Sequence, residues 1–133
     1  MPELADRLRD DQVCWVATTR PDGRPHLTPI WFVWAAERFW LCTLPKAVKA
    51  ANLAAEPRVS VALEGGKAPA VAEGRAVLHL APPFPAEAVA GFVAKYDWDI
   101  DHDGEGYTTL IEIVVDRWLM NGGPIGGGAA TEG

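Results

Sequence analysis

The chain has 133 residues, of which 49% are hydrophobic and 23% are charged, and its formal net charge is −6. This length suits one domain with its own core, and the apolar fraction is too high for a disordered chain. An acidic chain without a dense cluster of Lys or Arg is not typical of nucleic-acid binding. No apolar stretch is long enough to cross a membrane, and a charged N-terminus without an apolar signal core favours the cytoplasm.

Hydrophobic patterning predicts short strands joined by tight connections, with a few short helices between them. In chain order we expect a helix at 3–10, strands at 13–19, 26–34 and 39–43, a helix at 45–57, strands at 58–64 and 70–80, a helix at about 85–97 and a last strand at 107–120. The connections are too short for repeated βαβ crossovers, so the six strands favour a small antiparallel β-barrel, mainly β in class. We expect one domain over 1–120 and a flexible Gly-rich tail at 121–133.

The predicted strand at 26–34 follows a turn centred on Asp-Gly and is unusual for its prolines. Pro25 and Pro29 cannot donate to a sheet ladder, and prolines are normally kept out of central strands. The strand starts with the polar residues His26 and Thr28, whereas both of its faces are apolar beyond residue 29. We therefore expect its far half to be buried on both faces. The polar half is expected at one end of the barrel, where the histidine is either structural or functional.

A second feature lies at the start of the predicted helix at 45–57. Lys46 and Lys49 lie three residues apart near its N-terminus, where cations oppose the helix dipole unless an anion is bound. Free N–H groups, the dipole and two ammonium groups together would hold a phosphate, with Thr43 adding a hydroxyl and Asn52 on the same face. The alternative is a solvated helix face with two ordinary lysines.

Other motifs give weaker indications. The acidic stretch at 99–107 matches the first half of a calcium loop, but Leu110 occupies the position that needs a carboxylate, so a solvated acidic loop is the better interpretation. Cys14 and Cys42 lie in apolar runs and are expected to be buried thiols. No metal-ligand spacing, hydrolase motif or Rossmann motif is present. The six tryptophans favour a large aromatic core or a subunit interface.

Four segments, taken in order, carry a resemblance to a known family. They are VATTRPDGRPHLTPIWFVW, FWLCT, the pattern K-x-x-K-x-x-N-L with a following PRVSV, and VAEGRAVL. Together they resemble the pyridoxamine 5′-phosphate oxidase-like flavin-binding split barrels, and in particular the flavin- and deazaflavin-dependent oxidoreductase branch. The resemblance covers about residues 8 to 118. The chain lacks the Arg-Leu-x-Pro-type ending of true pyridoxamine phosphate oxidases, so vitamin B6 oxidase activity is not expected.

The resemblance implies a six-stranded antiparallel split β-barrel that forms a homodimer, with a cofactor groove between the protomers. It implies F-420 or FMN as the cofactor, with a slight preference for F-420. By position in the family pattern, the residues expected at the cofactor phosphate are Thr43, Lys46, Lys49 and Asn52. The residues expected beside the ring are His26, Thr28 and Pro29.

Three functions follow as hypotheses. The first is an oxidoreductase in which a bound cofactor transfers hydride to or from a small, flat, conjugated substrate, so that no protein acid or base is strictly required. The second is a non-catalytic flavin, deazaflavin or haem binder on the same fold, where haem would call for an axial ligand such as His79 or His102. The third is a scaffold without a ligand, against which the paired lysines argue.

Overall fold

The computed structural model describes residues 3–123 of the chain. The last strand ends at Asn121, one residue past the expected domain boundary at 120. The rest of the expected tail, from 124 onward, lies outside the described residues. The division into a domain and a flexible tail therefore stays a prediction.

The described residues form three α-helices, one short 3-10 helix and seven strands. In chain order these are α1 (Leu4–Asp10), β1 (Val13–Thr19), β2 (Pro25–Trp31), β3 (Val33–Ala35), β4 (Arg38–Thr43), α2 (Val48–Ala55), β5 (Arg58–Leu63), β6 (Ala70–His79), α3 (Ala86–Tyr96), η1 (Ile100–His102) and β7 (Thr109–Asn121). All strand pairs are antiparallel, and they form one open sheet in the order β2-β1-β5-β6-β7-β4-β3. The mainly β, antiparallel architecture is confirmed, whereas the expected count of six strands is wrong.

The additional strand comes from a break at Phe32, inside the segment expected to be one strand. The Phe32 N–H donates to the Tyr96 hydroxyl oxygen at 3.1 Å, and that hydroxyl lies 2.7 Å from the Phe32 carbonyl oxygen. A side chain from α3 thus satisfies this backbone in place of a neighbouring strand. The expectation that the far half is buried on both faces holds for Phe32 and Val33 but is wrong for Trp31, which is 48% exposed.

The sheet curves so strongly that its first strand approaches strands near its other edge. β2 pairs only with β1 and is therefore an edge strand, which places Pro25 and Pro29 where missing donors are tolerated. β2 lies close to β4 without a ladder between them, as in a barrel that is split along one seam. The expected bulge near Gly74 is confirmed by a register shift between β6 and β7, where a Cβ on Gly74 would collide with the Val114 carbonyl oxygen.

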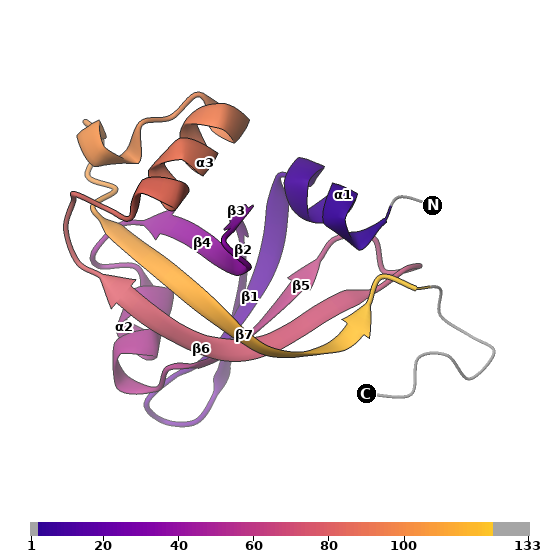
Figure 1. Ribbon diagram of the computed structural model, residues 1–133. Helices are drawn as coiled ribbons and strands as arrows, with labels where there is room; N and C mark the ends of the chain where they lie inside the picture. The colour runs from indigo at the N-terminus through magenta and orange to yellow at the C-terminus, as the bar shows by residue number, and fades with distance from the viewer. Residues whose placement is uncertain (1–2, 124–133) are drawn as a thin grey trace.

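Two clusters of buried side chains hold the fold together. The larger fills the barrel with residues of β1, β4, β5, β6 and β7 and includes Leu53 of α2. The smaller lies between β3, β4 and α3, where Trp40 and Phe92 are fully buried. Gly91 brings α3 so close to Val33 that any Cβ would collide with it. In the view of Figure 1, α1 and α3 lie above the long strands β6 and β7, and α2 lies below them.

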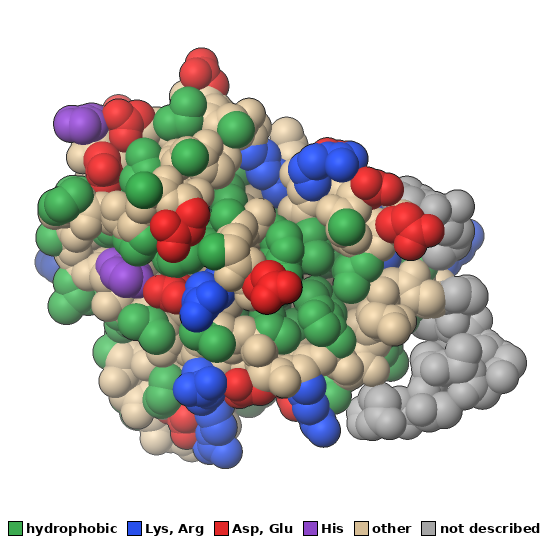
Figure 2. All heavy atoms as spheres, in the orientation of Figure 1, with side chains coloured by type: hydrophobic (Ala, Val, Ile, Leu, Met, Phe, Trp, Pro, Cys, Tyr) green, Lys and Arg blue, Asp and Glu red, His purple; other side chains and the backbone are tan. Residues whose placement is uncertain are grey.

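The distribution of surface charge and the burial of the two cysteines are both typical of a packed globular domain. Acidic and basic side chains are interspersed over the face shown in Figure 2, and neither sign gathers into a large patch there. Within residues 3–123, no helix is long and apolar enough to cross a membrane. Cys14 and Cys42 are free and buried as expected, and burial raises the pKa of each thiol to about 12.

Candidate functional site

One face of β2 turns inward and carries the polar residues that the sequence singled out. Across the β1–β2 ladder, His26 is opposite Thr18 and Thr28 is opposite Val16, and both partners are buried. Directly opposed residues of an antiparallel pair share one face of the sheet. His26 and Thr28 therefore lie half-buried on the inner face, whereas Pro29 lies on the exposed outer face.

Two polar atoms on this inner face are buried without a hydrogen-bond partner, namely Nδ1 of His26 and Oγ1 of Thr28. Burial, followed by the positive charges of Arg20 and Lys49, lowers the pKa of His26, so its ring is neutral at neutral pH. A buried polar atom without a partner costs about 1–3 kcal/mol. Polar atoms of a ligand would relieve this penalty, so the pair marks a candidate contact for one.

Lys49 supplies a positive charge next to this face. α2 begins at Val48, and Ala47 at its N-cap provides no side-chain acceptor for the free N–H groups of the first turn. Over the described residues, Lys49 is half-buried and its amine makes no hydrogen bond or ion pair. Burial lowers the pKa of that amine. A half-buried cation without a counter-charge, at an uncapped helix start, favours the binding of an anion.

A cavity of about 580 Å³ opens along the seam between β2 and β4. Four segments line it: β2 with Ile30 and Trp31, the end of β4 and its following turn with Cys42, Thr43 and Leu44, the start of α2 with Ala47 and Lys49, and the segment after α3 with Trp98, Asp103, Glu105 and Tyr107. His26 and Thr28 do not line it, but Ile30, the next residue on their face of β2, does. The split in the sheet thus creates a cleft that contains one unpaired cation.

Four of the seven residues expected to bind a cofactor come together around this seam. Thr43 and Lys49 line the cavity, and His26 and Thr28 lie on the adjoining face of β2. The polar groups of these four residues are buried or half-buried. They are the part of the expected site that the fold gathers into one place.

The other three expected residues lie elsewhere. Lys46 is exposed in a turn before α2, because the helix begins at Val48 and not near residue 45. Asn52 is buried, and its Nδ2 donates to Oγ1 of Thr18 at 3.0 Å, so its amide holds α2 against β1. Pro29 faces outward. The binding roles of all seven residues stay predictions.

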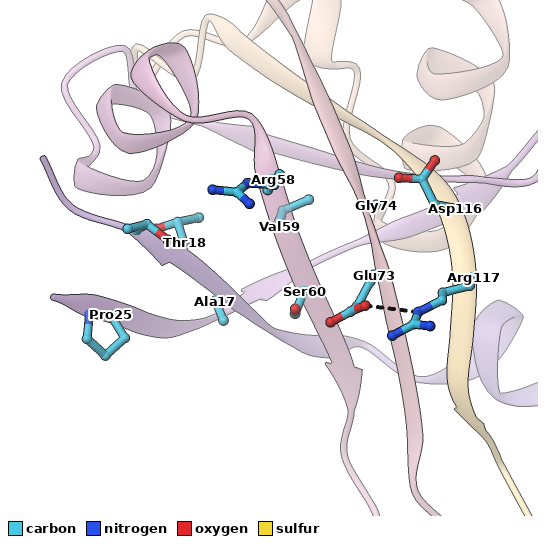
Figure 3. A pocket seen from close by; sticks show the side chains of 11 residues that line it. Ala17, Thr18, Pro25, Arg58, Val59, Ser60, Glu73, Gly74, Asp116 and Arg117 are labelled. Atoms are coloured by element: carbon cyan, nitrogen blue, oxygen red, sulfur yellow. Dashed lines mark hydrogen bonds and ion pairs between the residues drawn. The ribbon is translucent and has the colours of Figure 1, made fainter. Parts of the chain in front are cut away.

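A second hollow of about 580 Å³ lies where β1, β5, β6 and β7 run side by side. Figure 3 shows Arg58, Glu73, Asp116 and Arg117 around it. Its charges are already paired: Nε of Arg117 lies 3.1 Å from Oε1 of Glu73, Asp116 pairs with Arg75, and Arg58 pairs with a carboxylate two residues earlier. This hollow therefore has no unpaired cation for an anion to bind among its paired charges, whereas the cavity at Lys49 has one.

The sequence reasoning did not identify which aromatic and acidic residues line the cavity. Trp98 precedes the acidic stretch at 99–107 and Tyr107 ends it, and that stretch was interpreted as a solvated acidic loop. Across the part of the chain that is described, no three potential metal-ligating side chains come together. The available signal was the pair of aromatic residues that bracket the loop, together with a tryptophan at the end of β2.

Comparison with known proteins agrees with this architecture. The open, curved antiparallel sheet with a cavity at its seam defines a split barrel. A family model described as pyridoxamine 5′-phosphate oxidase matches residues 1–122. The chain belongs to this pyridoxamine 5′-phosphate oxidase family, as the four ordered segments of its sequence indicated. No curated protein matches the chain.

Solved structures share the fold. A conserved hypothetical protein from Mycobacterium tuberculosis is 27% identical with a TM-score of 0.70, over 89% of this chain and 82% of that one. A protein named F420 reductase is 20% identical with a TM-score of 0.66, over 84% of this chain and 91% of that one. An FAD-binding protein from Mesorhizobium loti is 20% identical with a TM-score of 0.63, over 86% and 88%. The last two likenesses show the fold alone.

Proposed function

We propose that this protein is an oxidoreductase that binds F-420 or FMN at the seam between β2 and β4 and transfers hydride to or from a small conjugated substrate. The observation that carries the proposal is Lys49, a half-buried cation without a counter-charge at an uncapped helix start. Two buried polar atoms without partners lie on the adjoining strand face. This combination fits a ligand that carries both a phosphate and a polar ring system.

Family membership and the fold neighbours support a flavin-type cofactor. The neighbours include proteins named F420 reductase and FAD-binding protein, and the matched family model is that of an oxidase. The preference for F-420 over FMN is slight and comes from the resemblance of the sequence to the deazaflavin-dependent branch. The cofactor supplies the hydride chemistry, so the chain needs no acid or base of its own for that step.

Each residue of the site has its own task under this proposal. The Lys49 amine and the first N–H groups of α2 neutralise the phosphate, and Thr43 adds a hydroxyl from the end of β4. His26 and Thr28 offer hydrogen bonds to polar atoms of the ring. The aromatic side chains that line the cavity exclude water from the reacting ring face.

We also propose a homodimer in which the second protomer completes the groove. The outer face of β2 is an apolar strip at a sheet edge, where Leu27 is 60% exposed, Trp31 is 48% exposed and Pro29 lies between them. Leu44 and Tyr107, which line the cavity, are exposed as well. Contiguous exposed apolar residues are typical of interaction surfaces. Light scattering after size-exclusion chromatography measures the mass, and a monomer at micromolar concentration would contradict the dimer.

The haem-binding alternative has less support. His79 shares a hydrogen bond of 2.9 Å with Glu112, and His102 shares one of 2.8 Å with Asp99. Neither histidine lines the cavity at the seam. A Soret band after addition of haem would restore this alternative.

The decisive experiment is a titration of the cofactor-free protein with FMN and, separately, with F-420, followed by the fluorescence of each cofactor. Saturable binding of either one supports the proposal, whereas failure of both to bind below high micromolar concentration removes it. Turnover with a panel of enones and quinones then distinguishes an enzyme from a carrier, because a carrier binds the cofactor and leaves every compound unchanged. The absorbance and mass of any co-purifying cofactor decide between the two candidates.

A further inference from the structure

The segment after α3 brings aromatic rings into the cavity at the seam. Trp98 and Tyr107 both line it, and their rings meet edge to face with centroids 5.6 Å apart. Trp31 lines it from β2, with its ring 6.4 Å from that of Trp98. Aromatic walls on two sides favour a planar guest, since flat rings pack against one another with the least loss of contact.

Asp103 places a fixed negative charge in the same cavity. Its Oδ2 accepts hydrogen bonds from the N–H groups of Glu105 at 2.9 Å and Tyr107 at 2.8 Å, and its Oδ1 accepts one from the Trp98 indole at 3.0 Å. Burial acts in the opposite direction, yet these bonds hold the pKa of Asp103 below its usual range, so the carboxylate is ionised at neutral pH. Its charge reaches the cavity wall, where it adds to burial in raising the pKa of Cys42.

Glu105 adds a second carboxylate, and this one is unengaged. Among residues 3–123 its side chain makes no hydrogen bond or ion pair, and neither Glu105 nor Asp103 pairs with Lys49. Gly106, with a φ of +89°, turns the chain so that the residues on both sides of it face the cavity. The acidic stretch that fails as a calcium loop therefore equips the cavity with aromatic rings and two negative charges.

We propose that this cavity selects a planar, positively charged substrate, such as an aromatic ring that bears a protonated amine, over a planar anion. The inference rests on the proposed function, because it assigns the substrate to the aromatic and acidic wall while Lys49 holds the phosphate of the cofactor. A cation gains from the faces of tryptophan and tyrosine rings and from both carboxylates. An anion of the same shape meets two like charges once the cofactor phosphate neutralises Lys49, the cation that lines the same cavity.

The test uses three probes that share one ring and differ in charge: naphthylmethylammonium, naphthalenemethanol and naphthoate. Isothermal titration of the full-length protein with bound cofactor gives the three dissociation constants that test the charge preference, and titration without cofactor shows how far free Lys49 attracts naphthoate. At low ionic strength we expect the ammonium probe to bind about tenfold more tightly than the carboxylate, with the alcohol between them. High salt should reduce that ratio to about threefold or less, because it screens charges at an open cavity.

Matched variants assign the preference to the loop. Glu105→Gln keeps the shape of the side chain and should reduce the ratio about threefold. Glu37→Gln is the control, since this exposed carboxylate lies before β4, at the end of the strand remote from Thr43. Asp103 is left intact, because its hydrogen bonds hold the loop together. An equal ratio in the two variants would overturn the proposal.

The remaining outcomes of the titration test the charge preference and the proposed function separately. An ammonium probe that binds no more tightly than naphthoate overturns the charge preference, and so does the absence of binding by all three probes. If FMN or F-420 binds but the anion is preferred, the substrate class is wrong while the proposed function stands. If neither cofactor binds but the ammonium probe is still preferred, the oxidoreductase proposal fails while the charge selectivity of the cavity stands.

Discussion

Replacement of Lys49 by Met gives the sharpest prediction about the cofactor site. Met has a similar length and no charge, so the substitution removes the cation without leaving a large void. Hydrogen bonds to a charged group contribute about 1.5–3 kcal/mol, and the half-exposed position of Lys49 favours a lower figure of about 1–2 kcal/mol. The dissociation constant of FMN or F-420 should therefore rise about 5- to 30-fold.

The control is Lys46→Met, which removes a lysine three residues away that is exposed and precedes α2. It should change the affinity by less than about twofold, because an exposed charge is screened by solvent. The fluorescence titration described above measures both variants. The cofactor-free Lys49→Met protein should unfold at the same urea concentration as the parent or a higher one, since it loses a half-buried charge without a partner.

The pH dependence gives an independent check on the same residue. Burial lowers the pKa of the Lys49 amine in the cofactor-free protein, and a bound phosphate would raise it again. Affinity of the parent protein should therefore fall as pH rises from neutral toward the alkaline range, and the Lys49→Met variant should lack this component of the decline. An unchanged dissociation constant in Lys49→Met, or an equal loss in Lys46→Met, would refute the placement of the phosphate.

Three further substitutions probe the fold. Nζ of Lys95 is buried without a hydrogen bond, and burial lowers its pKa to about 8 from 10.5. In the parent protein the cost of burying this charged amine is therefore complete below a pH of about 8. It is relieved as the pH rises toward 10.5. Lys95→Met should thus be more stable at neutral pH, by about 1 kcal/mol after allowance for solvent screening, and urea titrations should show this gain shrinking at alkaline pH; a gain independent of pH would contradict the assignment. Asn52→Ala should cost about 1–3 kcal/mol of unfolding free energy, because it leaves the buried Thr18 hydroxyl without its donor; an unchanged urea midpoint would show that the bond is dispensable. Gly91→Ala should destabilise by about 1–2 kcal/mol, because the collision with Val33 outweighs the gain in helix propensity; a rise in melting temperature would show that α3 moves away freely.

Local patterning was enough to locate most of the sheet. The strand expected at 13–19 is β1 with the same bounds, and the one expected at 58–64 differs from β5 by one residue. In these segments apolar and polar residues alternate or β-branched residues are frequent, and both properties can be recognised from residues that are adjacent in the sequence. The break at Phe32 was not predictable in this way, because its backbone is satisfied by the hydroxyl of Tyr96, 64 positions further along the chain.

The candidate site was predictable only for those residues whose placement depends on a single helix or strand. Lys49 follows from the chemistry of a helix start, and it lies near one. Lys46 lies outside the helix because the N–H of Ala47 donates to the Leu44 carbonyl oxygen in a turn that delays the first helical residue. The bond from Asn52 to β1, and the aromatic walls of the cavity, depend on how separate elements pack, which no spacing within one element reveals.

The two buried thiols can report on two different motions of the protein. Only the thiolate reacts with alkylating reagents, so both cysteines are nearly inert in the folded state. Cys14 is enclosed within the barrel and becomes reactive only when the barrel itself comes apart. Cys42 needs less, because it lies in the cavity wall and donates from Sγ to the Tyr107 carbonyl oxygen at 3.5 Å, so displacement of that loop uncovers it. With one alkylating reagent and peptide mass analysis, the rate of modification at Cys42 therefore measures opening of the cavity. The rate at Cys14 measures global unfolding.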